Sequence, residues 1–204
     1  MVKDARAVLK EISEKRKDAS VRREPILREK SYELLLETVE KKRPERILEI
    51  GTNEGLSAVS MMAVSENSFL TGIEIDEERY AVAQNNFRKF GMSNRAKIFL
   101  GDAREIVPLL SGKYDFIFLD GPKGHYYEFL PYLLSALNVG GILFADNVLY
   151  RGYIFSQNAP QKHNTIKHCM ENFLTAVTTD RNLKTVVFDV EDGVSITEKI
   201  RQTS

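Results

Sequence analysis

Residues 46–57 read Arg-Ile-Leu-Glu-Ile-Gly-Thr-Asn-Glu-Gly-Leu-Ser, a short apolar run followed by a Gly-x-x-x-Gly turn. The run has the length of a buried strand, and residues 55–64 are expected to form a helix. Glycines in such a turn let the backbone bend tightly and let a ligand approach it. The turn lacks the central glycine of the dinucleotide fingerprint Gly-x-Gly-x-x-Gly, which disfavours a pyrophosphate cradle and allows a ligand without phosphates.

Strands and helices are expected to alternate from this point to the C-terminus. Strands separated by helices predict a parallel sheet with helices on both faces. The last two expected strands are joined by an Asp-Gly turn and must pair antiparallel. The predicted fold is therefore α/β, a doubly wound, mostly parallel sheet of about seven strands with one reversed strand. The further strands are expected at 69–75, 96–100, 114–119, 141–145, 184–189 and 194–197, and the further helices at 77–90, 103–110, 126–137 with a break near Pro131, and 163–177.

The segment before this core is expected to be helical. An apolar stripe that begins at Ala5 predicts a first amphipathic helix. Pro25 is expected in the first turn of a second helix, which ends before Pro44. We therefore divide the chain into an N-terminal helical segment, residues 1–43, and a core domain, residues 44–204.

Composition excludes several classes of protein. The 204 residues carry 29 Lys and Arg against 29 Asp and Glu, so the whole molecule is not a polycation. Residues 1–46 carry 14 basic against 10 acidic residues, an excess of +4 that suits either a phosphate contact or a solvated helix face. A single cysteine, Cys169, excludes an intramolecular disulfide and a cysteine zinc site. With no signal-peptide pattern and no apolar run of about 20 residues, we expect a soluble, cytoplasmic protein that does not enter a membrane.

Acidic residues follow the second and third strands of the predicted core. Glu74 lies 19 residues beyond Gly55, about where an acid meets a ribose diol in doubly wound folds. Both NAD and S-adenosylmethionine carry that ribose, so Glu74 indicates a nucleoside without saying which one. Asp102 is placed either to accept a hydrogen bond from an adenine amino group or to cap the following helix.

Oxygen-bearing side chains follow the fourth and fifth strands. Asp120 comes after one apolar strand, and Asp146 and Asn147 come after the next. If these strands are neighbours, two carboxylates and an amide oxygen converge on one point, which suits Mg²⁺ or Mn²⁺. Each residue taken singly is also ordinary turn chemistry. Lys123 lies close by in the sequence.

Together these motifs resemble the cation-dependent O-methyltransferase family, which includes catechol and caffeoyl-CoA O-methyltransferases. Within it the chain is most similar to the bacterial branch of tRNA 5-hydroxyuridine methyltransferases, through Glu-Pro-Ile-Leu at 24–27 and Asn-Val-Leu-Tyr-Arg-Gly at 147–152. The resemblance implies a Rossmann-like class I methyltransferase fold, S-adenosylmethionine and a divalent cation. The matching motifs are Glu-Ile-Gly-Thr-Asn-Glu-Gly-Leu-Ser at 49–57, Gly-Ile-Glu-Ile-Asp at 72–76, Gly-Asp-Ala at 101–103, Phe-Leu-Asp-Gly-Pro-Lys-Gly at 118–124 and Ala-Asp-Asn-Val-Leu at 145–149.

The resemblance also implies roles for individual residues. Lys123 matches the proton-accepting catalytic lysine of the family, although Pro122 before it departs from the small residues that many relatives carry. The implied metal ligands are Asp120, Asp146 and Asn147. The implied cofactor residues are Leu27, Gly51 and Ser57 for the methionine portion, Glu74 for the ribose, Asp102 and Ala103 for the adenine edge, and Asp120, which would touch both cofactor and metal.

The resemblance implies two functions, and a third from another class is disfavoured by the missing central glycine and by the set of Asp120, Asp146 and Asn147. The first is methylation of the 5-hydroxyl of 5-hydroxyuridine at the wobble position of a tRNA anticodon loop. The second is the same chemistry on a small catechol-like phenol. The third, from another class, is a nicotinamide-dependent dehydrogenase or a non-catalytic nucleoside-binding module. A homodimer is also implied. Candidate RNA contacts are Arg22, Arg23, Lys41 to Arg43, Arg151 and Lys162, and candidate stacking residues are Tyr126, Tyr127, Tyr150 and Tyr153.

Overall fold

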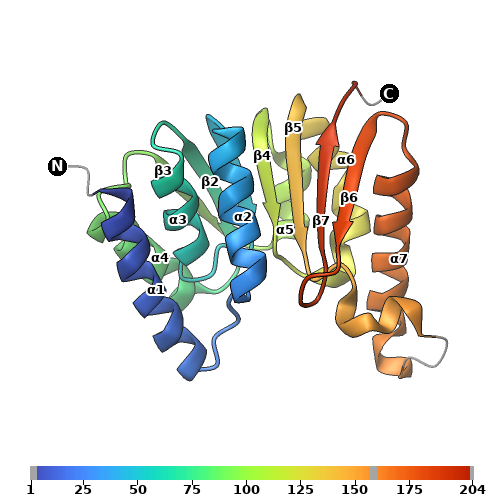
Figure 1. The fold of residues 1–204 in the computed structure, drawn as a ribbon, viewed down its shortest axis with the longest axis horizontal. Coiled ribbons are helices and arrows are strands. Elements are labelled where there is room, and N and C mark those ends of the chain that lie inside the picture. The colour runs from blue at the N-terminus through green and yellow to red at the C-terminus, as the bar shows by residue number, and fades with distance from the viewer. Residues whose placement is uncertain (1–3, 157–159, 203–204) are drawn as a thin grey trace. The chain divides into compact units, whose positions relative to one another are not determined.

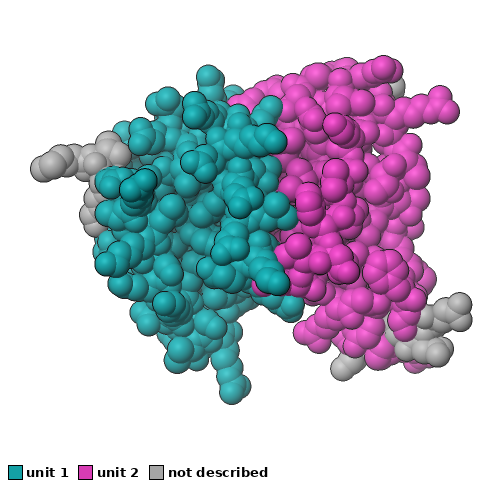
Figure 2. Space-filling model, viewed as in Figure 1, with its two compact units in different colours: residues 1–103 teal, residues 104–204 magenta. Residues whose placement is uncertain are grey.

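The computed structural model describes residues 4–156 and 160–202, with the backbone alone at Lys162. Its strands follow the order β3-β2-β1-β4-β5-β7-β6 in a seven-stranded sheet (Figure 1). This order is doubly wound, with the strand sequence reversing at β1, and it confirms the predicted α/β class. The chain folds as two compact units, residues 1–103 and residues 104–204 (Figure 2).

The first unit contains three parallel strands and their helices. Strand β1 pairs with β2, and β2 pairs with β3, each in parallel. Helices α1 and α2 pack against α3, and α4 packs against β2 and β3. The elements are α1 (Ala5–Val21), α2 (Glu29–Lys42), β1 (Arg46–Ile50), α3 (Leu56–Val64), β2 (Phe69–Glu74), α4 (Glu77–Lys89) and β3 (Ala96–Leu100).

The second unit contains the remaining four strands. Strand β4 pairs with β5 in parallel, and β7 runs antiparallel to both β5 and β6. The reversed strand is therefore the last one, as the Asp-Gly turn predicts. The elements are α5 (Ala103–Ile106), which begins at the end of the first unit, η1 (Val107–Leu109), β4 (Tyr114–Leu119), η2 (Lys123–His125), α6 (Tyr126–Ala136), β5 (Leu137–Asp146), η3 (Tyr150–Phe155), η4 (Gln161–His163), α7 (Asn164–Thr179), β6 (Leu183–Phe188) and β7 (Val194–Lys199).

Continuous burial explains why the central strands read as apolar runs. In β4 every residue from Phe116 to Leu119 is buried, and β1 is buried from Ile47 to Ile50. A strand covered on both faces shows no alternation of polar and apolar residues, which is typical of parallel sheets. None of the helices in the described part of the chain is long and apolar enough to cross a membrane.

Two expectations about proline are wrong. Pro25 lies outside any helix, because α2 begins only at Glu29, and the Pro25 carbonyl instead accepts a hydrogen bond from Asn53. Pro131 lies inside α6 without ending it. Pro131 and Tyr127, whose carbonyl loses its helical donor, both lie on the exposed face, so water can satisfy that carbonyl.

A buried lysine closes the C-terminal end of α6. Lys199, the last residue of β7, is 0 % exposed, and its ammonium group donates to the carbonyls of Leu134 at 2.6 Å and Leu137 at 3.0 Å. The last carbonyls of a helix have no partner within the helix, so an outside donor must satisfy them. Lys113 donates to the carbonyl of Ser135 nearby, but from an exposed position.

We expect Lys199→Met to lower the free energy of unfolding by about 2–4 kcal/mol, because two buried acceptors lose their donor. Lys113→Met is the matched control, and it should change the free energy of unfolding by less than about 0.5 kcal/mol because water replaces its ammonium group. Urea denaturation of both variants measures the difference. Equal losses in the two variants would contradict the role given to Lys199.

Candidate functional site

The turn after β1 forms a compact loop in the first unit, the cofactor loop, residues 51–55. The backbone N–H groups of Gly51 and Thr52 both donate to the Ile73 carbonyl at 3.0 Å, which holds the loop against β2. Gly55 has φ 75°, and a Cβ there would lie 3.1 Å from the Cβ of Ala83. Both the left-handed backbone and the close approach of α4 therefore require glycine at this position.

Glu74 ends β2 beside this loop and is only 6 % exposed. Its Oε1 accepts from the backbone N–H groups of Ile75 at 3.0 Å and Asp76 at 2.9 Å, and its Oε2 accepts from the N–H of Asn53 at 2.6 Å. A carboxylate offers about four acceptor sites, so capacity for a further donor remains on Oε2. A ribose hydroxyl fits that capacity.

The other sequence-predicted cofactor residues of the first unit lie around the same ends of β1, β2 and β3. Ser57 is in the first turn of α3, and Asp102 directly precedes α5, whose first residue is the buried Ala103. Leu27 is buried in the segment that joins α1 to α2. The structure therefore gathers these residues where doubly wound folds bind nucleosides.

The predicted metal ligands come together in the second unit. Leu119 pairs with Ala145 across β4 and β5, so Asp120 and Asp146 follow in register at neighbouring strand ends. Neighbouring strands lie about 4.8 Å apart, which is close enough for two carboxylates to share an ion. The Tyr126 hydroxyl donates to the Leu119 carbonyl at 2.9 Å and lies 3.3 Å from the Asp146 carbonyl, so it ties the two ends together.

Electrostatics at these strand ends favour a cation. Burial, and to a smaller extent the charge of Asp146, raise the pKa of Asp120 from 3.8 to about 7, although Lys123 acts in the opposite direction. The Lys123 ammonium lies 3.9 Å from Oδ1 of Asp120. Two carboxylates and the amide of Asn147 are hard oxygen donors, so the set fits Mg²⁺ or Mn²⁺. Within residues 4–156 and 160–202 no three His, Cys, Asp or Glu side chains form such a cluster, and here the third ligand is an amide.

The turn between β6 and β7 supports the segment that carries Asn147. The Val148 and Leu149 N–H groups donate to the carbonyls of Gly193 and Asp192 at 3.0 and 2.9 Å. Gly193 has φ 84°, and a Cβ there would lie 2.1 Å from Cγ of Leu149. Only glycine allows this contact. The turn between β6 and β7 therefore packs directly against the segment that follows Asn147.

Tyr150 and Tyr153, two of the predicted stacking residues, contact His163 in a way that the sequence did not reveal. The Tyr150 hydroxyl hydrogen-bonds Nδ1 of His163 at 2.7 Å, and the Tyr153 ring stacks on the same imidazole at 5.0 Å. His163 lies 13 and 10 positions after these tyrosines on a separate 3₁₀ turn, so no helical or strand spacing signals its contact with them. Tyr126, by contrast, is fully buried and bonded to backbone, so its predicted role in stacking on a substrate is wrong.

The candidate RNA contacts have different surroundings in the structure. Arg22 is paired with Glu54, and residues 41–43 lie at the end of α2 just before β1, away from the carboxyl ends that carry the site. Arg151 is exposed in η3. The side chain of Lys162 lies outside the described residues.

The sequence of the chain is similar to those of known O-methyltransferases. The O-methyltransferase family matches residues 2–200 of the chain. A catechol O-methyltransferase of Niastella koreensis is 34% identical over 122 residues, which are 57% of this chain and 55% of that relative, so the match spans little more than half of its length.

Solved structures show the same fold. A Staphylococcus aureus protein provisionally named a caffeoyl-CoA O-methyltransferase has a TM-score of 0.84 at 25% identity, covering 92% of this chain and 91% of that one. The Podospora anserina methyltransferase PaMTH1, bound to SAH (S-adenosylhomocysteine), has a TM-score of 0.78 at 23% identity, covering 95% and 87%.

The fold and the loops at its strand ends define a Rossmann-like methyltransferase. The match over nearly the whole chain narrows this class further: the chain belongs to the O-methyltransferase family. The enzyme class expected from the sequence is thereby confirmed, whereas the individual site residues stay predictions.

In protein kept free of metal with EDTA, we expect stability to depend on pH through Asp120. Between pH 3.8 and about 7 the folded state holds a proton on Asp120 that the unfolded chain has released, so the free energy of unfolding falls as the pH rises through this window. Asp120→Asn removes this titration and should flatten the fall between pH 3.8 and about pH 7 in urea denaturation. Asp115→Asn, near the start of the strand that Asp120 follows, is the control and should follow the wild type.

Proposed function

We propose that the protein transfers the methyl group of S-adenosylmethionine to a hydroxyl of an acceptor with two adjacent oxygens, with the help of a divalent cation. The observation that carries this proposal is the in-register placement of Asp120 and Asp146 at the ends of β4 and β5, with Asn147 next to them. Two adjacent oxygens can complete the coordination of one ion that this trio leaves open.

Each half of the reaction has its own residues. In the first unit Glu74 would hold the donor's ribose, Gly51 and Ser57 its methionine portion, and Asp102 and Ala103 its adenine. In the second unit Asp120, Asp146 and Asn147 would hold Mg²⁺ or Mn²⁺. When bound, the cation would lower the pKa of the acceptor hydroxyl.

Lys123, in its uncharged amine form, would accept the acceptor's proton at Nζ and become an ammonium. It lies on the short 3₁₀ turn after β4, with Nζ 3.9 Å from Oδ1 of Asp120. A general base has to be mobile enough to reach the proton and close enough to act on it. Because the chemistry lies in positioning two reactants, the protein mainly supplies orientation, which is worth roughly 7–11 kcal/mol of barrier.

A small catechol-like phenol is the acceptor that the observations favour. A relative 34% identical to the chain is named a catechol O-methyltransferase. Of the basic residues expected to bind RNA, Arg22 already has a carboxylate partner in Glu54, and residues 41–43 lie at the end of α2 that precedes β1. A tRNA needs several phosphate contacts for its affinity.

The 5-hydroxyuridine of a tRNA anticodon loop is the second candidate. Its 5-hydroxyl and adjacent carbonyl oxygen have the same chelating geometry as a catechol. One specific feature favours it: η3 presents an exposed cation, Arg151, and an exposed aromatic ring, Phe155, shortly after Asn147. Proteins that hold unstacked bases combine such charges with aromatic rings.

We expect Asp146→Ala to abolish measurable binding of Mn²⁺ and to lower turnover roughly a hundredfold or more, because the buried oxygen ligand is lost. EDTA should do the same to the wild type, and added Mg²⁺ should restore it. Asp115→Asn at the other end of β4 should retain both properties. Methyl transfer that persists in EDTA would show that the trio is not a catalytic metal site.

The salt dependence of activity and affinity distinguishes the two candidate acceptors. With a catechol, turnover should change little between about 50 and 200 mM salt, and Arg151→Ala should have little effect. With tRNA that contains 5-hydroxyuridine, affinity should fall steeply over the same range. Radiolabelled methyl transfer to each acceptor, together with nucleoside mass spectrometry of the tRNA, decides between them. Sedimentation of the same preparation tests the expected homodimer.

A further inference from the structure

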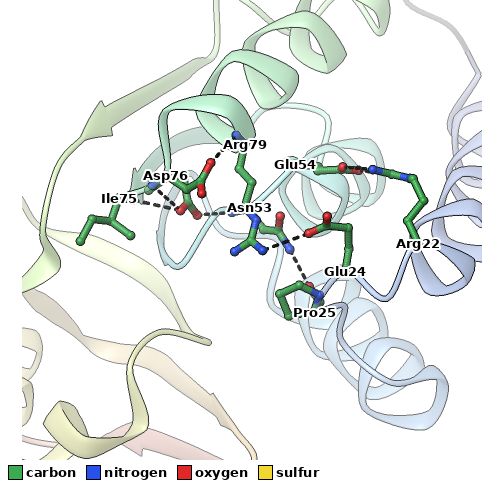
Figure 3. Close-up of polar contacts among 9 residues, drawn as sticks. Arg22, Glu24, Pro25, Asn53, Glu54, Ile75, Asp76 and Arg79 are labelled. Carbon is green, nitrogen blue, oxygen red and sulfur yellow. Dashed lines mark hydrogen bonds and ion pairs between the residues drawn. The ribbon is translucent and has the colours of Figure 1, made fainter.

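The segment that joins α1 to α2, residues 22–28, is fastened to the cofactor loop at two points (Figure 3). We name it the connector. The Arg22 guanidinium donates to both carboxylate oxygens of Glu54, at 2.8 and 3.0 Å. Nδ2 of Asn53 donates to the Pro25 carbonyl at 2.5 Å. Both partners on the loop side lie between Gly51 and Gly55, where the cofactor is expected.

A third contact ties the connector to the helix that follows Glu74. Glu24 lies 3.1 Å from the Arg79 guanidinium on α4 (Figure 3). The backbone N–H of Arg79 in turn donates to Asp76, which caps α4. The connector therefore contacts both the loop after β1 and the first turn of α4, which follows Glu74 in the chain.

Asn53 joins the connector to the ribose carboxylate through a single residue. Its side chain bonds the connector, and its backbone N–H bonds Oε2 of Glu74 at 2.6 Å. Oε2 is the oxygen that retains capacity for a ribose hydroxyl, so the Asn53 N–H fixes the acceptor that the ribose would use. Asn53 has φ 50°, a left-handed conformation that asparagine tolerates better than most residues.

The Arg22–Glu54 ion pair has favourable hydrogen-bond geometry, but the Arg22 side chain is half exposed to solvent. The pair is bidentate, which adds strength and orientation. Arg22 is 52% exposed and Glu54 10% exposed, and an ion pair with one partner in water contributes little to overall stability. Its effect is therefore expected on the local placement of the connector, and not on the stability of the fold.

We propose that Asn53 is a positioning residue that couples the connector to Glu74, and that the Arg22–Glu54 pair keeps the connector against the cofactor loop while the cofactor is bound. The proposal rests on the assignment of Glu74 to the ribose. A closed connector holds Asn53 in place, and Asn53 holds Oε2 of Glu74 ready for the ribose hydroxyl. Loss of either fastening leaves this acceptor less well oriented, so the cofactor binds more weakly.

The experiment measures the affinity of S-adenosylhomocysteine by calorimetry and needs no turnover. Asn53→Gly keeps the left-handed backbone and the N–H to Glu74 but removes the bond to Pro25, and we expect it to weaken binding about threefold to tenfold. Asn53→Asp, which keeps the size but not the donor, should weaken it at least as much. Arg22→Ala should weaken binding about twofold to fivefold, and the exchanged pair Arg22→Glu with Glu54→Arg should recover most of the loss.

A matched control exists in the same unit. Lys89 on α4 pairs with Glu11 on α1, which also ties the N-terminal helices to the core but does not touch the cofactor loop. Lys89→Ala should leave the affinity for S-adenosylhomocysteine unchanged. Trypsin adds a second readout, because Arg23 and Arg28 are cleavage sites within the connector. The ligand should slow cleavage there in the wild type and in Lys89→Ala, and should slow it less in Asn53→Gly.

The outcomes separate this proposal from the function on which it rests. If the wild type does not bind S-adenosylhomocysteine, the assignment of the cofactor site fails and the coupling fails with it. If the wild type binds but Asn53→Gly binds equally well and is equally protected from trypsin, the coupling alone is overturned. A loss of affinity in Lys89→Ala as large as that in Asn53→Gly would likewise overturn it, because the effect would then be general to the N-terminal helices.

Discussion

The carboxylates of Asp120 and Asp146 lie at neighbouring strand ends and repel each other, and the candidate site in the second unit depends on how that repulsion is offset. The register of β4 and β5 leaves Asp120 and Asp146 one strand spacing apart, and burial makes the charged form of Asp120 still less favourable. A fold tolerates such an arrangement where a cation or a proton offsets it. Lys123 fits that requirement in part, because its ammonium lies 3.9 Å from Oδ1 of Asp120.

The direction of parallel strands explains which candidate site residues the sequence could predict. Parallel strands place all their carboxyl ends at one edge, so residues that directly follow strands are brought together whatever lies between them. This is why Asp120 and Asp146 could be singled out in the sequence as residues that follow two apolar strands, whereas the pairing of those strands is a finding of the structure. The length of β5 was underestimated, since Leu137 to Gly140 precede the apolar run but still belong to the strand.

Contacts outside this rule could not be predicted. The Tyr150–His163 pair and the Asn53–Pro25 bond join residues that sit on loops, where no periodicity fixes the direction of a side chain. Pro25 and Pro131 were misjudged because a local propensity was outweighed by tertiary contacts in the first case and by solvent access in the second. Tyr126 was expected to stack on a substrate ring, yet it lies at the start of α6 with its side chain fully buried in the core.

The contact between Gly193 and Leu149 shows that a site can depend on residues that are not themselves candidate ligands or catalytic groups. No residue of the hairpin between β6 and β7 is a candidate ligand, base or cofactor contact. The backbone that carries Asn147 nevertheless rests on that hairpin and fits there only because position 193 has no side chain. A shortened homologue that ended before this hairpin would retain every candidate site residue in its sequence, and an alignment would score it as intact. It would still lack the turn that supports the segment of Asn147, one of the candidate metal ligands.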